Sequence, residues 1–307
     1  MAGQGLLDRT AVRELAAALD LRPTKQRGQN FVTDANTVRR IVALAGLDAD
    51  DAVLEIGPGL GSLTLGLLEL ARHVGVVEIE TSLAQQLPRT VAARMPRASE
   101  KLTVTEADAL RVGDLGDPLP DVVVANLPYN VSVPVLLHLM ALASEAGERV
   151  LRRGLVMVQL EVADRLVAGP GSKTYGVPSV KLAWYAAARR VGTVPPSVFW
   201  PVPNVDSGLV ALERREPPQT TATREQVFTV IDAAFGQRRK MLRAALSGLC
   251  GSSAAASAAL ERAGVDPQVR GEVLQVTDFA RIAEQVFAGG AGSAPTSADG
   301  PAGPSAG

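Results

Sequence analysis

The chain has 307 residues, of which 47% are hydrophobic and 21% are charged, and its formal net charge is −1. The apolar content supports a folded core and the length allows one large domain with a smaller one, so the composition excludes a largely disordered protein. The near-zero charge argues against indiscriminate binding of nucleic acid, and one cysteine with two histidines leaves little material for a disulfide or a metal site. We therefore expect no bound metal.

The N-terminal segment, residues 1–21, is predicted to form a helical lead with one helix over residues 6–19. Acidic residues interrupt its apolar positions, which is unlike a secretory signal. No later stretch approaches the ~20 uninterrupted apolar residues of a membrane helix. We expect a cytoplasmic protein that has no membrane partner.

A loop follows over residues 22–33, and Asp34 is predicted to cap the next helix. Short apolar runs then alternate with helical stretches. The runs predicted to be strands are residues 52–56, 74–79, 102–106, 121–125 and 155–160, with two closing strands at 185–194 and 207–215. Nearly continuous apolar strands separated by helices are typical of a parallel sheet covered on both faces. The sequence therefore predicts an α/β domain over residues 22–215.

The remainder of the chain shows no convincing strand. Apolar residues at helical spacing, including Phe228, Ile231 and Leu242, predict a small all-helical domain over residues 216–288. Residues 289–307 are rich in Gly, Ala, Ser and Pro, so we expect a disordered tail.

The stretch LEIGPGLGSLT places Glu55, Gly57 and Gly59 where the first strand of the sheet meets the next helix. Glycines at such a turn let the backbone approach a ligand, although many sheet proteins use glycine there only to turn. The E-x-G-x-G-x-G spacing differs from G-x-G-x-x-G, and Pro58 disfavours a pyrophosphate cradle of successive amides. A nicotinamide-dependent enzyme is therefore disfavoured.

Acidic residues end the next two predicted strands. Glu78, with Ile79 beside it, lies about twenty residues beyond the glycines, where a carboxylate can accept hydrogen bonds from ribose hydroxyls. Asp108 follows the third strand and can receive the amine of an adenine, while the Ala109 amide can face a ring nitrogen. Each acid alone is more often a solvated strand end, but together they predict a nucleoside-containing cofactor at this edge.

The stretch NLPYN, residues 126–130, follows the fourth strand and contains no proton-abstracting group. The side-chain oxygen of Asn126 and the carbonyl of Leu127 can accept both N–H bonds of one aromatic amine, which directs its lone pair toward a methyl donor. Pro128 restricts the preceding residue to extended geometry. Tyr129 can stack on a base, and Phe199 offers a second face. Taken alone these are ordinary loop residues; beside the predicted cofactor site they favour an amino-methyltransferase.

The glycine loop and the acids resemble those of the class I S-adenosylmethionine-dependent methyltransferases. With KQRGQNFV, NLPYN, FWPVPNVDS and FGQRRKML, the chain over residues 22–287 resembles the ribosomal RNA adenine dimethyltransferases, in particular the bacterial small-subunit (16S) branch. The resemblance implies a Rossmann-like, mostly parallel seven-stranded sheet, S-adenosylmethionine as cofactor, and dimethylation of two adjacent adenines in the 3′-terminal hairpin of 16S rRNA. It further implies a monomer that acts on the immature 30S subunit.

The resemblance also implies residue roles. Asn30 and Val32 would close over the cofactor, and the basic residues would contact RNA: Arg22, Lys25, Arg27, Arg238, Arg239, Lys240 and Arg243. Three positions depart from the expected pattern: Val32 replaces leucine, Glu80 replaces aspartate and Asn204 replaces lysine. The last departure puts one phosphate contact in doubt.

Two alternatives stay open. The first is the large-subunit rRNA adenine methylase of macrolide resistance, which belongs to the same family. The second is a ribosome-assembly factor that acts mainly by binding, with methylation secondary or absent.

Overall fold

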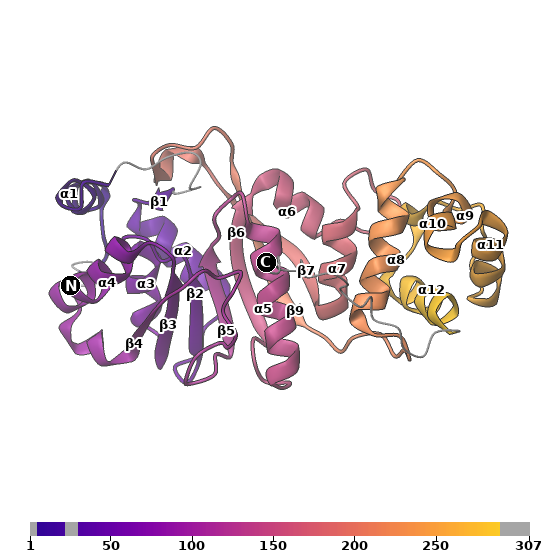
Figure 1. Cartoon of the computed structure of the whole chain (residues 1–307). Coiled ribbons are helices and arrows are strands. Elements are labelled where there is room, and N and C mark those ends of the chain that lie inside the picture. The colour runs from indigo at the N-terminus through magenta and orange to yellow at the C-terminus, as the bar shows by residue number, and fades with distance from the viewer. Residues whose placement is uncertain (1–4, 22–29, 289–307) are drawn as a thin grey trace, which may run out of the picture. The chain divides into compact units, whose positions relative to one another are not determined.

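The computed structural model describes residues 5–21 and 30–288, and the chain divides into two compact units, residues 1–217 and 218–307. The predicted tail at 289–307 lies outside the described residues, as does the basic loop at 22–29. Each unit is described by itself below (Figure 1).

A seven-stranded sheet organises the first unit (Figure 1). Its order is β4-β3-β2-β5-β6-β9-β7. The first five strands in this order pair in parallel, and β9 is antiparallel to both of its neighbours, β6 and β7. The strands are β2 (Ala52–Ile56), β3 (His73–Glu78), β4 (Leu102–Glu106), β5 (Val122–Asn126), β6 (Arg153–Gln159), β7 (Ala186–Val194) and β9 (Ser207–Arg214). The predicted mostly parallel seven-stranded sheet is confirmed.

Helices lie on both sides of this sheet (Figure 1). They are α1 (Arg9–Ala18), α2 (Ala35–Ala45), α3 (Ser62–Leu68), α4 (Thr81–Arg94), α5 (Ser132–Ala146), α6 (Leu160–Leu166) and α7 (Val177–Tyr185), with 3-10 turns η2 (Pro96–Lys101) and η3 (Pro196–Val198). Asp34 caps α2 as predicted, because its carboxylate accepts the Thr37 amide at 2.7 Å. Helices α6 and α7 were not predicted, and Leu160, which was predicted to end a strand, is the first residue of α6.

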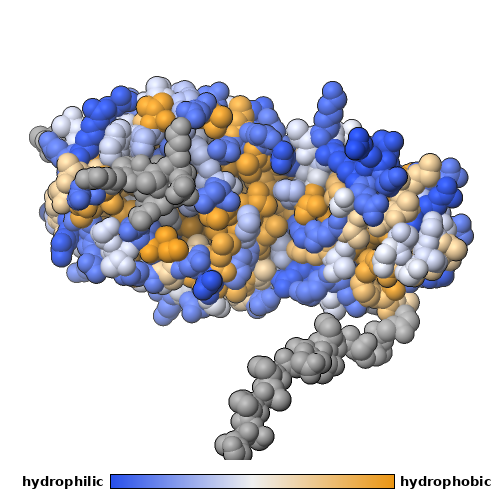
Figure 2. All heavy atoms as spheres, turned by 45° about the horizontal axis from the view of Figure 1, so that its top comes forward, coloured by the Kyte–Doolittle hydropathy of each residue, from blue (hydrophilic) through white to orange (hydrophobic). Residues whose placement is uncertain are grey.

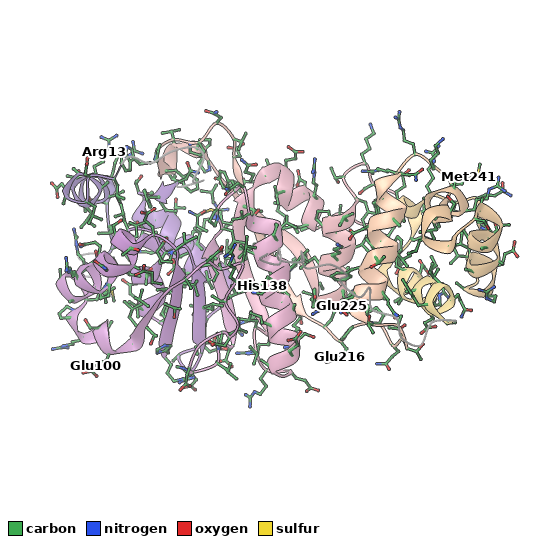
Figure 3. The ribbon with its side chains drawn as sticks, viewed as in Figure 1. Arg13, Glu100, His138, Glu216, Glu225 and Met241 are labelled. Carbon is green, nitrogen blue, oxygen red and sulfur yellow. The ribbon has the colours of Figure 1, made fainter. Side chains whose placement is uncertain are left out.

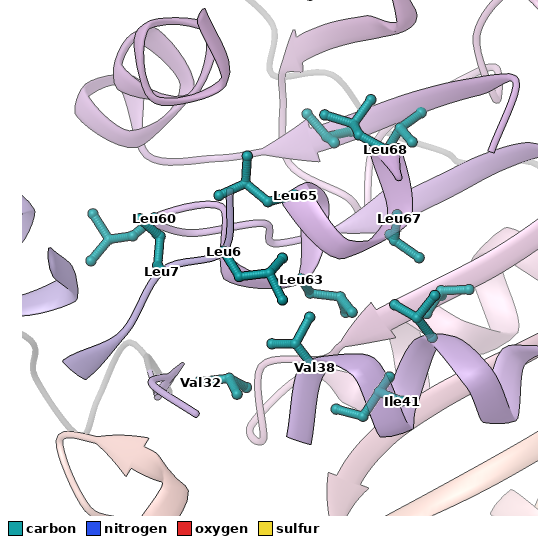
Figure 4. Close-up of a cluster of buried hydrophobic side chains, with 14 of the residues drawn as sticks. Leu6, Leu7, Val32, Val38, Ile41, Leu60, Leu63, Leu65, Leu67 and Leu68 are labelled. Carbon is teal, nitrogen blue, oxygen red and sulfur yellow. The ribbon is translucent and has the colours of Figure 1, made fainter. Parts of the chain in front are cut away.

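The N-terminal lead is part of the first unit. Its helix α1 buries Ala11, Val12 and Ala16 in the same hydrophobic cluster as Leu6 and Leu7. Figure 4 shows this cluster where the chain before α1 meets side chains of α2 and α3. The lead therefore contributes apolar surface to the core of this unit instead of standing apart from it.

Two short strands join segments that lie far apart in the sequence. β1 (Phe31–Val32) pairs antiparallel with β8 (Phe199–Trp200), and the backbone amide and hydroxyl of Thr33 both donate to the Val198 carbonyl, at 2.8 and 3.0 Å. The Phe31 and Trp200 rings stack with centroids 6.2 Å apart. We call residues 30–33 with 198–200 the β1–β8 ribbon.

The second unit is all-helical in its described part. It contains α8 (Arg224–Gly236), α9 (Leu242–Ala245), α10 (Ser247–Cys250), α11 (Ser253–Arg262), η4 (Gly271–Val273) and α12 (Val276–Phe287). Ile231 and Leu242 are buried, and Phe235 packs on Phe279 with ring centroids 6.0 Å apart. Met241 does not join this core, since it is 42% exposed at the start of α9 (Figure 3).

Candidate active site

A cavity of about 500 Å³ opens in the first unit where the carboxyl ends of β2, β3, β4 and β5 meet. That volume lies within the ~300–1,000 Å³ typical of small-molecule sites. Every residue predicted to bind the cofactor lines it: Asn30, Val32, Glu55, Gly57, Gly59, Glu78, Ile79, Asp108, Ala109 and Asn126. The strand order brings these residues together although the sequence separates them by up to a hundred positions.

The glycine loop is in close contact with the β1–β8 ribbon. Gly57 and Gly59 have φ angles of +64° and +58°, which side-chain-bearing residues rarely adopt. A Cβ at Gly59 would lie 2.6 Å from the Phe31 ring, so no other residue fits there without displacing that ring. The loop backbone therefore forms one wall of the cavity directly under the ribbon.

Glu78 is buried and holds the glycine loop. Its two carboxylate oxygens accept the amides of Gly59 at 3.1 Å and Glu80 at 3.0 Å. Burial raises the pKa of Glu78 above its ordinary value, although these backbone hydrogen bonds oppose the rise. Each oxygen retains a lone pair, so the carboxylate can still accept hydrogen bonds from two hydroxyl groups.

Glu55 is the most deeply buried acid of the cavity, at 1% exposure. The Thr64 hydroxyl donates to one of its oxygens at 2.6 Å. Burial raises the pKa of Glu55 to about 8, and the nearby Glu78 carboxylate adds to the rise. A cationic group bound in the cavity would favour the charged form of this acid.

The far end of the cavity combines an acid with apolar surface. Asp108 accepts the Leu110 amide at 2.9 Å, and its other oxygen lies 3.7 Å from the Arg111 Nε. Ile79 is 66% exposed, and it lines the cavity together with the partly exposed Leu110. An aromatic ring between these two side chains would remove their apolar surface from water.

The NLPYN stretch reaches the cavity through Asn126, Pro128 and Asn130, whereas Leu127 does not line it. The Asn126 amide nitrogen donates to the Asn30 carbonyl at 2.9 Å, so the side-chain oxygen is the group of this carboxamide that can accept from a substrate. Leu127 is buried and its amide donates to the Met157 carbonyl at 3.0 Å, which continues the β5–β6 pairing by one residue. Pro128 lines the cavity against Gly57.

The two aromatic residues predicted to hold the base do not line this cavity. Tyr129 is half-buried, and its hydroxyl lies 2.7 Å from the Ser207 Oγ. Phe199 is 1% exposed and belongs to the hydrophobic core, because the β8 strand turns its ring inward while Trp200 packs on Phe31. The structure therefore places Phe199 away from the open position that the sequence interpretation assigned to it.

The predicted RNA contacts fall into two groups. Arg22, Lys25 and Arg27 lie outside the described residues. In the second unit, Arg238 pairs with Glu272 at 3.0 Å, whereas the exposed side chains between α8 and α9 and on α9 are Arg239, Lys240 and Arg243.

Several cavity residues escaped the sequence prediction. Phe31, Ser62, Thr81 and Leu110 line the cavity, and the buried Ser62 hydroxyl has no hydrogen-bond partner among the described residues. Ser62 and Leu110 follow predicted residues within LEIGPGLGSLT and EADAL, so those motifs could have indicated them.

Residues 5–21 and 30–288 contain neither a metal-binding cluster nor a membrane-spanning helix. There, no three His, Cys, Asp or Glu side chains are grouped so as to hold a metal ion. No helix within those ranges has the length and apolar character needed to cross a membrane.

A family model described as ribosomal RNA adenine dimethylase matches residues 21–287. The chain belongs to the ribosomal RNA adenine dimethylase family. Among curated relatives, the ribosomal RNA small subunit methyltransferase A of Cutibacterium acnes is 59% identical over 296 residues, covering 95% of this chain and 98% of the relative. The protein of that name from Streptomyces coelicolor is 63% identical over 280 residues, covering 91% and 96%.

Solved structures of two methyltransferases share the fold. A dimethyladenosine transferase from Plasmodium falciparum superposes with a TM-score of 0.66 at 23% identity, covering 82% of this chain and 95% of that one. The 23S rRNA methyltransferase ErmE gives a TM-score of 0.59 at 26% identity, covering 84% and 99%. The predicted class I methyltransferase fold is thereby confirmed.

As a member of this dimethylase family, the chain is an S-adenosylmethionine-dependent methyltransferase. The cavity fits that cofactor on its own chemistry. The Glu78 oxygens suit ribose hydroxyls, the exposed apolar side chains of Ile79 and Leu110 suit an adenine ring, and the unpartnered Ser62 hydroxyl is a polar group that a ligand can satisfy.

Proposed function

We propose that this enzyme dimethylates two adjacent adenines in the 3′-terminal hairpin of 16S rRNA, acting as a cytoplasmic monomer on the immature 30S subunit. Relatives at 59% and 63% identity over nearly their whole length carry the name ribosomal RNA small subunit methyltransferase A, which supports the small-subunit assignment. The geometry that carries the proposal is the hydrogen bond from Asn126 to the Asn30 carbonyl at the cofactor cavity.

This hydrogen bond fixes which end of the carboxamide meets the substrate. With its nitrogen held at 2.9 Å from the Asn30 carbonyl, Asn126 presents its oxygen as an acceptor. That oxygen and the Leu127 carbonyl can together accept both N–H bonds of one adenine amine, which directs the nitrogen lone pair at the methyl group. The cofactor supplies an activated methyl on a sulfonium, and the protein contributes orientation and electrostatics. After one transfer the amine keeps a single N–H, so it must rotate before the second.

The free energy of stacking and the cost of exposing a buried ring decide how much Tyr129 and Phe199 each contribute to holding the base. Stacking on an aromatic side chain contributes roughly 1–3 kcal/mol per base. Tyr129 is only partly buried, but the Phe199 ring would first have to leave the core, and exposing a phenylalanine costs about 1.5–3 kcal/mol. The two terms nearly cancel for Phe199. Tyr129 therefore provides most of the net stacking energy in our proposal. Phe199 adds a second stacking face only if the β1–β8 ribbon moves so that its ring leaves the core.

Mapping of methylated nucleotides tests this function. Purified protein with labelled S-adenosylmethionine should methylate 30S particles whose 16S rRNA lacks the modification, and the label should map to two adjacent adenines near the 3′ end. Asn126→Ala is the control that removes the acceptor, and its cofactor Kd is measured beside its activity because Asn126 also lines the cavity. A parallel assay on large-subunit particles tests the alternative: label on 23S rRNA there would instead support it, and the 26% identity to ErmE is its weaker support.

The alternative, a ribosome-assembly factor that acts mainly by binding, is tested by variants that separate particle binding from methylation. We propose that Arg239, Lys240 and Arg243 contact rRNA phosphates, because all three are exposed. Replacing all three by alanine should weaken particle binding and reduce the salt slope by about two to three. The Asn126→Ala variant should bind particles normally and fail to methylate them. Normal assembly in cells carrying only Asn126→Ala would show that binding has a function of its own.

A further inference from the structure

The hydroxyl of Tyr129 is anchored to a strand that lies two places away in the sheet. Tyr129 follows β5, and its oxygen lies 2.7 Å from the Ser207 Oγ, while the sheet order is β5-β6-β9. Ser207 is the first residue of β9 and is 0% exposed. The tyrosine side chain therefore reaches across the carboxyl end of β6 and ends on a buried hydroxyl.

Ser207 itself has little freedom to move. It pairs with Gln159 at the end of β6 and with Val194 at the end of β7, so strands hold it on both sides. At the next residue, Gly208, an added Cβ would lie 2.4 Å from the Ala163 Cβ of α6, which shows how closely the strand packs on that helix. The anchor is thus part of the rigid sheet, whereas Tyr129 stands in a loop.

We propose that Ser207 is a positioning residue for methyl transfer, because it holds the Tyr129 ring in one orientation as a platform for the target adenine. This inference rests on the proposed stacking role of Tyr129. A tyrosine has two rotatable side-chain bonds, so an unanchored ring would populate several rotamers and only a fraction of molecules would present the stacking face. With the anchor, nearly all molecules present the stacking face before substrate arrives, which is the usual benefit of preorganisation.

The same contact assigns the phenol a structural task. Burial raises the pKa of Tyr129 above its ordinary value, so the phenol stays protonated at neutral pH. Its hydroxyl is engaged by Ser207 and is not directed to the cofactor cavity, which Tyr129 does not line. The ring is therefore the part that meets the base, and a phenylalanine at this position would keep the ring but lose the anchor.

A double-mutant cycle tests the proposal. Ser207→Ala and Tyr129→Phe each remove the same hydrogen bond from opposite ends, and the double variant removes nothing more. The readouts are the single-turnover rate of methyl transfer to 30S particles at saturating cofactor, the cofactor Kd by calorimetry, and the thermal unfolding midpoint. Tyr129→Ala, which deletes the stacking ring, is the reference variant.

Each single variant should lower the single-turnover rate about three- to tenfold. The fold-reduction in the double variant should equal that of a single variant and should not be the product of the two single fold-reductions. The cofactor Kd should stay at the wild-type value in all of them. If Ser207→Ala fails to fold, Tyr129→Phe still measures the anchor with Ser207 in place. Wild-type rates in Tyr129→Phe beside a large loss in Tyr129→Ala would overturn the anchor alone, as would multiplicative effects in the double variant. A wild-type rate in Tyr129→Ala would overturn the stacking role as well.

Discussion

The cofactor side and the base side of the site are built in different ways. The cofactor side is an open cavity whose acids and glycines sit at the ends of adjacent parallel strands, and Glu78 ties them together through the Gly59 and Glu80 amides. On the base side, Tyr129 is anchored on Ser207 and Phe199 lies in the core, and neither ring lines that cavity. The cofactor side is therefore prepared in advance, whereas on the base side only the Tyr129 ring is held in advance and the Phe199 ring is still buried.

The largest predicted effect is on the free energy of unfolding, and it tests whether Phe199 on the base side belongs to the core. Phe199→Ala removes a ring that is 1% exposed and should lower the free energy of unfolding by about 3–5 kcal/mol. Val202→Ala, in the same loop but exposed, is the matched control and should change it by less than about 0.5 kcal/mol. Urea unfolding gives both values. A Phe199→Ala protein as stable as the control would mean that the ring is not part of the core.

The next effect falls on catalysis. Asn126→Ala should lower the single-turnover rate by roughly 10²–10³, the usual effect of removing one aligned acceptor or donor from a transition state. Asn126→Asp should be similarly impaired, because its carboxylate would face the Asn30 carbonyl in place of the N–H that now donates there. Radiolabel transfer to 30S particles measures both rates. Near-normal activity in Asn126→Asp would show that the orientation of the carboxamide does not matter.

On the cofactor side, Glu78→Gln should weaken cofactor binding by roughly 10- to 100-fold, since hydrogen bonds to a charged acceptor contribute about 1.5–3 kcal/mol. The amide nitrogen of the glutamine would also face a backbone N–H. Glu106→Gln is the matched control, because Glu106 on β4 is the register partner of Glu78 on β3 but does not line the cavity. Calorimetry with the cofactor measures each Kd. Equal Kd values in the two variants would remove Glu78 from the site.

The smallest predicted effect is a pH dependence of stability. Because the pKa of Glu55 rises from 4.5 to about 8 on folding, the folded chain holds a proton in that window that the unfolded chain has lost. The Glu55 contribution to stability should then fall as pH rises from 4.5 toward 8, and Glu55→Gln should lack this part of the slope. Urea unfolding across the window compares the two proteins. Parallel slopes would show that Glu55 is not held protonated.

Much of the fold follows from local sequence patterns. The strands at 52–56 and 102–106 have their predicted bounds, since each is a short apolar run between helical stretches. The cofactor residues could be predicted for the same reason: in a parallel sheet the residue after each strand reaches the same edge. The α7 helix was missed because Gly176 and Pro178 at its start are equally typical of a loop.

The base side could not be predicted because it depends on pairing between distant segments. Phe199 stands beside two prolines and a tryptophan, and nothing nearby shows that it pairs with Val32 and turns inward. The bond from Asn126 to the Asn30 carbonyl spans 96 positions, and the contact of Tyr129 with Ser207 spans 78. Such contacts carry no periodic signal, so only the three-dimensional structure reveals them.

A structure of the enzyme with the demethylated cofactor product and the 3′-terminal hairpin of 16S rRNA tests the central claim most directly. The account predicts that one flipped adenine places its amine within about 2.7–3.2 Å of both the Asn126 side-chain oxygen and the Leu127 carbonyl. The Asn126 nitrogen should still donate to the Asn30 carbonyl. An adenine amine held by an acidic or basic side chain elsewhere in the site, with Asn126 turned away, would contradict it.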